Sequence, residues 1–168
     1  TARGALTSTK YTEFNNKPLV DTIYNNIYVG SISAGTVMNG ASGGINNIVM
    51  GYQAGDTLST GNNNTVLGYQ SGKSITTGVA HAFFAGYQSG LSATSATNSI
   101  FIGRPAGSGA TSASFASFLG RSAGLNATGA QYGIFVGDNA GNTASSASNA
   151  IFLGQNAGYQ ATSATFTN

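Results

Sequence analysis

The segments NSIFIGRPAG at residues 98–107 and NAIFLGQNAG at residues 149–158 are two copies of one unit that runs through most of the chain. In each copy a short apolar run ends at a glycine, and a second glycine follows four residues later, after a small residue. The first glycines recur every 17 residues, with one interval of 18, at Gly51, Gly68, Gly86, Gly103, Gly120, Gly137 and Gly154. Residues 25–35, NNIYVGSISAG, are interpreted as a degenerate eighth copy. A short fixed period predicts a stacked repeat architecture.

Each unit is expected to form one coil of a parallel β-solenoid. The run before the glycine is rich in β-branched and aromatic residues and is too short for a helix. The Gly-x-x-small-Gly segment that follows has turn chemistry, because glycine adopts positive φ at little steric cost. A second element of small residues, such as residues 93–96 or 110–113, is expected to be another short strand. The fold class is therefore predicted to be an all-β parallel β-solenoid, or β-roll, of about seven 17-residue coils, about 35 Å long.

The middle residue of each apolar run is itself apolar in every copy. These middle residues are Val49, Val66, Phe84, Phe101, Phe118, Phe135 and Phe152. Because successive strand residues face opposite sides, we expect the residues on either side of them to fill the coil and the middle residues to face outward. An exposed stripe of this kind needs a cover, which predicts an intertwined or packed homotrimer with these seven residues at the oligomer interface. In the alternative interpretation the middle residues face inward, and an aliphatic stripe outside needs the cover.

Composition limits the partners that can be expected. The 168 residues include six basic and four acidic residues, for a net charge of +2, and no cysteine. The basic residues are too few and too scattered for a nucleic-acid partner. No apolar run reaches the roughly 20 residues needed to span a bilayer, so no membrane insertion is expected. Regularly spaced apolar residues argue against a disordered linker over residues 46–158.

The chain divides into three regions. Residues 1–24 carry half of the charges and are expected to form an extended leader, with one strand at residues 18–24. Residues 25–45 form a transition that contains the degenerate repeat, and residues 46–168 form the β-solenoid array. The chain begins at Thr1 and stops within a repeat, so we expect it to be a segment of a longer polypeptide or a processed product.

The copies NNIVMGYQAG at residues 46–55 and NTVLGYQSG at residues 64–72, with the two quoted first, resemble repeats of bacteriophage tail fibres. They are also similar to the heads of trimeric autotransporter adhesins, which are parallel β-rolls wound as trimers. The adhesin repeat is usually shorter and has a small residue where this chain has phenylalanine. The resemblance therefore implies a virion tail fibre in preference to an adhesin head, with an extracellular or bacterial-surface location as the alternative.

No catalytic or metal-binding constellation is recognisable. The chain has one histidine, His81, no cysteine, and four acidic residues that are far apart in sequence. His81 occupies the place of asparagine in other copies and is interpreted as a polar turn residue. The glycines lack the Lys-Ser/Thr that completes a phosphate loop. We therefore expect a protein that is not an enzyme and that needs no cofactor.

One ligand site is suggested by the residues that follow the first glycine. In three consecutive copies these are tyrosine and glutamine: Tyr52, Gln53, Tyr69, Gln70, Tyr87 and Gln88. Aromatic and amide groups in register could bind a host surface glycan. The alternative is a self-supporting ladder in which each side chain contacts its own kind in the next coil.

The preferred function is a structural and receptor-binding segment of a trimeric phage tail fibre. A bacterial surface adhesin head or an extracellular filament subunit is the first alternative. An ice-binding solenoid is the second, because threonines recur beside small residues at Thr94, Thr111, Thr128 and Thr162.

Overall fold

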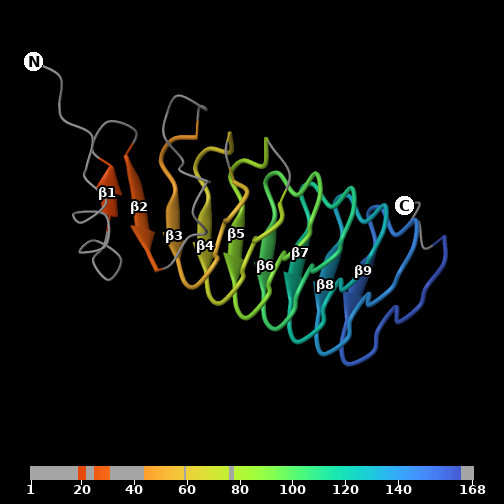
Figure 1. Ribbon diagram of the computed structural model, residues 1–168. Coiled ribbons are helices and arrows are strands. Elements are labelled where there is room, and N and C mark those ends of the chain that lie inside the picture. Colours follow the sequence, from red (N-terminus) through yellow and green to blue (C-terminus); the bar gives the residue numbers. More distant parts are fainter. Residues whose placement is uncertain (1–18, 22–24, 31–43, 59, 76–77, 164–168) are drawn as a thin grey trace, which may run out of the picture.

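The computed structural model describes residues 19–21, 25–30, 44–58, 60–75 and 78–163. These residues form a β-solenoid built on one nine-stranded sheet, with the strands side by side in chain order along the rod (Figure 1). The described residues contain no helix. The strands are β1 (Leu19–Asp21), β2 (Asn26–Val29), β3 (Ile48–Met50), β4 (Thr65–Leu67), β5 (Phe83–Ala85), β6 (Ile100–Ile102), β7 (Ser117–Leu119), β8 (Ile134–Val136) and β9 (Ile151–Leu153).

Strands β2 to β9 are parallel and in register, one repeat per coil. Val66 of β4 pairs with Phe84 of β5, and Phe101 of β6 pairs with Phe118 of β7. Strand β2 belongs to the degenerate copy, and its Tyr28 pairs with Val49. Strand β1 lies within the segment where one leader strand was expected, and it pairs antiparallel to β2. The 17-residue period therefore predicts the parallel stacking correctly.

The first glycine of each repeat makes a corner at positive φ, and in every coil except the last the next coil leaves no room for a Cβ. Gly103 has a φ of +127°, and a Cβ placed on it would lie 2.4 Å from the carbonyl oxygen of Gly120 in the next coil. Both the backbone conformation and the approach of the neighbouring coil therefore require glycine here. This double requirement explains why the glycine recurs in every copy.

The second strand expected in each repeat is not formed in the later coils, whose residues the structure describes at this place up to residue 163. Its residues make single isolated bridges, Thr111 to Thr128, Thr128 to Ser145 and Ser145 to Thr162. The next residue in each coil has a positive φ, as at Ser112 and Ser146, both at 50°. A left-handed residue turns the chain at once, so pairing cannot extend past one residue.

The middle residues of the strands lie inside the coil, and the prediction that they face outward is wrong. Phe118 is completely buried within a single chain, as are Phe84, Phe101 and Phe135. Their rings form a stack with centroid separations of 4.6 to 5.0 Å. Val49 and Val66 continue this column towards β2, and Phe152, in β9, is partly buried against it. Six of the seven residues are thus enclosed by their own chain, and intertwined chains are not needed to bury them.

The physical reason is that the coil interior has room for one large side chain per coil when the other inward residues are small. In the early coils Val66 is accompanied by Ile75, whereas later Phe118 is accompanied by Ala127, nine residues on in both cases. Larger and smaller residues thus exchange places and keep the interior filled. Because phenylalanine has more apolar surface than its aliphatic neighbours, placing it inside removes more apolar area from water.

Buried asparagines complete the interior of the early coils. The side-chain oxygen of Asn47 accepts a hydrogen bond from the backbone N–H of Asn64 at 2.9 Å, and Asn64 does the same for Ala82. Their side-chain amides donate to the carbonyls of Gly61 and Val79. Buried polar groups need partners of this kind. These asparagines, with Asn26 before them, hold the chain at the start of each strand.

Candidate functional surfaces

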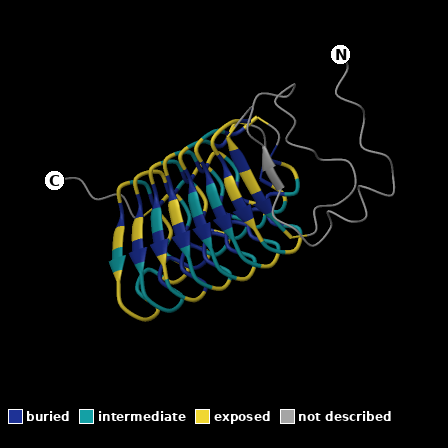
Figure 2. Cartoon of the chain, turned by 90° about the vertical axis from the view of Figure 1, so that its left-hand side faces the viewer, coloured by how far each residue is buried: buried dark blue, intermediate teal, exposed yellow. Residues whose placement is uncertain are grey.

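The outer face of the sheet is an extended apolar surface. On strands β3 to β9 the middle residue is turned inward, and the first and third residues are exposed or half-buried, an alternation that Figure 2 shows along the rod. Ile100 and Ile134 are 45% and 44% exposed. We define the outer face by its large exposed members, Ile27, Ile48, Met50, Ile100, Leu119, Ile134, Ile151 and Leu153. This is the arrangement of the alternative interpretation, with the aliphatic stripe outside.

The predicted tyrosines form a stacked column at the corner that follows the strands. The ring centroids of Tyr52 and Tyr69 are 5.4 Å apart, and those of Tyr69 and Tyr87 are 5.2 Å apart. The guanidinium of Arg104 lies over the ring of Tyr87 at 5.0 Å. Both faces of Tyr69 and Tyr87 are therefore covered by neighbours. The ring edges point outward, and the faces that a sugar would stack on are largely occupied.

The glutamines beside these tyrosines hydrogen-bond to one another. The side-chain amide of Gln70 donates to Gln53 at 2.9 Å, and that of Gln88 donates to Gln70 at 2.9 Å. All three have positive φ between 51° and 56°, a conformation that glutamine adopts less readily than asparagine or glycine. The structure thus brings the six predicted site residues together as the self-supporting ladder of the alternative interpretation. Glycan binding at these residues stays a prediction.

Charged residues continue this corner in the later coils. Arg121 donates to a carboxylate oxygen of Asp138 at 2.6 Å, with 64% of the Arg121 side chain exposed. An ion pair as exposed as this contributes only about 0.2–1 kcal/mol. We call the column formed by Tyr52, Tyr69, Tyr87, Arg104, Arg121 and Asp138 the tyrosine corner.

The opposite corner precedes the strands and is lined mostly by asparagine. We call the column Asn25, Asn46, Asn63, His81, Asn98, Phe115, Tyr132 and Asn149 the asparagine corner. The Asn46 amide donates to Asn63 at 3.2 Å, and Asn63 contacts the His81 ring nitrogen Nε2 at 3.2 Å. His81 is exposed and has a φ of 56°, as a polar turn residue would.

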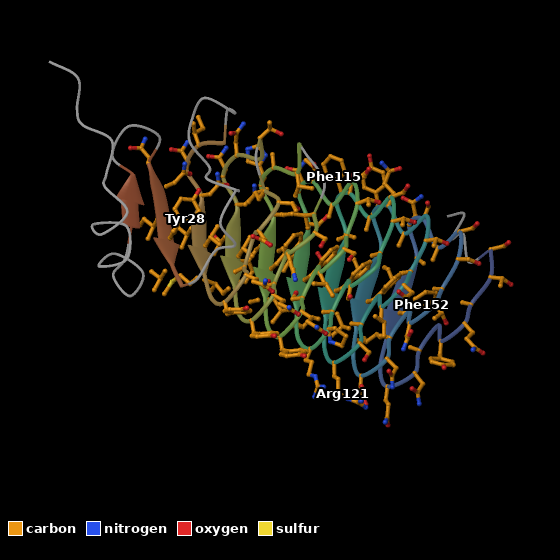
Figure 3. All side chains as sticks on the ribbon, in the orientation of Figure 1. Tyr28, Phe115, Arg121 and Phe152 are labelled. Carbon is orange, nitrogen blue, oxygen red and sulfur yellow. The ribbon has the colours of Figure 1, made fainter. Side chains whose placement is uncertain are left out.

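Phe115 and Tyr132 break the polar character of the asparagine corner. Their rings stack at 5.1 Å, and both side chains are half exposed. Sequence reasoning missed this pair. The signal was available, because Phe115 and Tyr132 align with Asn98 and Asn149, and aromatic residues are unusual at a turn position. Figure 3 places Phe115 and Arg121 at opposite edges of the rod.

The hydroxyl column considered for ice binding is interrupted. Isolated bridges align Thr111, Thr128 and Thr162, but Ser145 stands between the last two. Thr111 is half-buried, whereas Thr128 and Thr162 are exposed. The column is therefore neither uniform in composition nor uniform in exposure.

The part of the chain that the structure describes holds no group of three or more His, Cys, Asp or Glu side chains placed to bind a metal ion. Within the same residues, no helix has the length and apolar character to cross a membrane. Comparison with protein-family models, curated proteins and solved structures finds no match.

Proposed function

We propose that this chain is a non-enzymatic structural segment of a surface fibre, and that it assembles as a homotrimer through the outer face of its sheet. The observation that carries the proposal is the outer face itself, where large aliphatic side chains of β2, β3 and β6 to β9 are exposed in register. The largest exposed apolar patch on a protein surface is often a functional contact. The proposed trimer is packed from three complete solenoids, since each chain buries its own phenylalanines.

The area of the outer face can be compared with the area that a stable interface buries. Eight parallel strands at about 4.8 Å, each about 10 Å long, give a flat footprint of roughly 340 Å². A stable interface buries about 800 Å² per partner. The sheet therefore supplies nearly half of the area that one partner has to bury, and residues beside the sheet have to supply the rest of that area. Each isoleucine or leucine buried there would contribute roughly 1.5–3 kcal/mol.

The role proposed for the rod follows from its regularity. Coil number sets the length, and repeated contacts along the rod and around its axis give multivalent attachment. The resemblance of the repeats to phage tail fibres supports a virion fibre that attaches to a host. A bacterial surface adhesin or filament subunit shares the same design and is the alternative.

The experiment is to place charge on the outer face. Ile100→Asp combined with Ile134→Asp should convert the trimer to a monomer, because buried unpaired carboxylates oppose association. Circular dichroism should remain β-type, since both side chains lie outside the coil. The matched control is Ser112→Asp with Ser146→Asp, which adds the same charge at exposed turn positions away from the sheet. Equal masses for both variants in sedimentation would contradict the proposal.

A further inference from the structure

We propose that Phe115 and Tyr132 form a binding site for a neutral oligosaccharide at the asparagine corner. The inference goes beyond the proposed assembly, which is argued from the outer face of the sheet alone. It also moves the predicted glycan contact from the tyrosine corner to the opposite edge of the rod.

The first observation is the backbone conformation of the pair. All eight residues of the asparagine corner have φ between 56° and 60°. Asparagine tolerates this left-handed conformation, and bulky aromatic residues rarely adopt it. Unfavourable conformations of this kind gather at binding and active sites. Two consecutive coils thus have an aromatic residue at a turn position that asparagine occupies in most other coils.

The second observation is that the pair contributes little to packing. Phe115 and Tyr132 are 49% and 50% exposed, whereas Phe118 in the same coil as Phe115 is completely buried. The next residues along the column, Asn98 and Asn149, have shorter side chains. One face of each ring therefore extends beyond its neighbour, unlike Tyr69, which has a ring on both sides. Open aromatic faces suit the apolar face of a sugar ring.

The third observation concerns the amides around the rings. In the early coils the corner amides are bonded to one another. By contrast, the side chains of Asn98, Gln131 and Asn149 make no hydrogen bond with any described residue. Asn98 and Asn149 are three coils apart, about 14 Å. Amides both donate and accept hydrogen bonds, as the hydroxyl groups of a saccharide do.

The fourth observation is that the residues around the pair are uncharged, which bears on the charge of the ligand. The corner segments around the pair, residues 95–99, 112–116, 129–133 and 146–150, contain no charged residue. Arg121 and Asp138 lie at the tyrosine corner, at the opposite edge from Phe115 (Figure 3). A sialylated or phosphorylated ligand would find no counter-ion beside the rings. The site therefore fits a neutral oligosaccharide.

The test uses a variant that restores the residue type of the corner. Phe115→Asn with Tyr132→Asn should fold, because asparagine occupies the same position in other coils. The probes are trisaccharides of glucose, galactose, mannose and N-acetylglucosamine, with sialylated counterparts, titrated by calorimetry. The wild-type chain should bind at least one neutral probe more tightly than its sialylated counterpart. The double variant should bind it at least about tenfold more weakly, through loss of two ring contacts.

Two further variants show which residues of the chain determine the affinity for the neutral probe. Tyr52→Asn with Tyr69→Asn removes two aromatic rings from the tyrosine corner and should leave the affinity unchanged. Gln131→Ala leaves both rings in place and should weaken binding several-fold, through loss of one amide. Three results would overturn the proposal. The Tyr52 and Tyr69 variant could lose as much affinity as the Phe115 and Tyr132 variant, the latter could bind as tightly as the wild-type chain, or the wild-type chain could bind no neutral probe. A lower assembly mass for the Phe115 and Tyr132 variant would make the pair a contact between copies and would overturn it as well.

Discussion

Replacing Phe118 by alanine should remove about 4 kcal/mol from the free energy of unfolding. The ring is completely buried and lies between Phe101 at 4.7 Å and Phe135 at 4.6 Å. Burial alone gives a loss of about 3–5 kcal/mol for Phe→Ala. The loss should not fall to the lower end of this range, because hydrogen-bonded coils on both sides keep the cavity from closing. Urea unfolding followed by circular dichroism measures the change.

Phe115→Ala is the matched control in the same coil. Its side chain is half exposed, so the loss should stay within about 1 kcal/mol. The loss at Phe118 should also be the same at every protein concentration, because the ring is enclosed by its own chain. Equal losses at both positions would refute this reasoning. So would a loss at Phe118 that disappears on dilution, since that would place the ring between chains.

Three further changes have defined outcomes. Phe118→Val should lower the free energy of unfolding more alone than together with Ala127→Leu, which restores the pairing of buried Val49 with buried Leu58, nine residues on, in an early coil; additive losses in a double-mutant cycle would contradict the volume exchange. Gly103→Ala should destabilise by well over about 1 kcal/mol, and more than Gly154→Ala, whose added Cβ meets nothing within 4 Å; equal melting temperatures would show that coil approach is unimportant. Changing Tyr52, Tyr69 and Tyr87 to serine should lower the melting temperature through loss of the stack, whereas a glycan array should show unchanged binding. Lost binding by a folded variant would return the glycan site to the tyrosine corner.

The spacing of the glycines was enough to predict parallel coils in register, because a backbone corner such as Gly103 leaves no alternative residue. It could not tell which side of the strand faces inward. Alternation separates strand residues into two sets and gives both sets the same period. The decisive signal is tolerance of polar residues. Thr65 and Ser117 occur at the first strand position, whereas the middle position is apolar in every coil.

The tyrosine corner was recognised in the sequence because tyrosine recurs there in three consecutive repeats. Whether its ring faces are free depends on the coil spacing, which brings Tyr69 within stacking distance of both neighbours. Phe115 and Tyr132 were missed because they depart from the repeat instead of following it. An aromatic residue in a left-handed turn is recognised once the backbone is known.

Copies of this solenoid are proposed to associate as a trimer through the outer face of the sheet. Sedimentation equilibrium of the wild-type chain over a wide concentration range tests it most directly. We expect a single species of about three times the 16.8 kDa mass of one chain, persisting on dilution. A folded species of 16.8 kDa at all concentrations would contradict it.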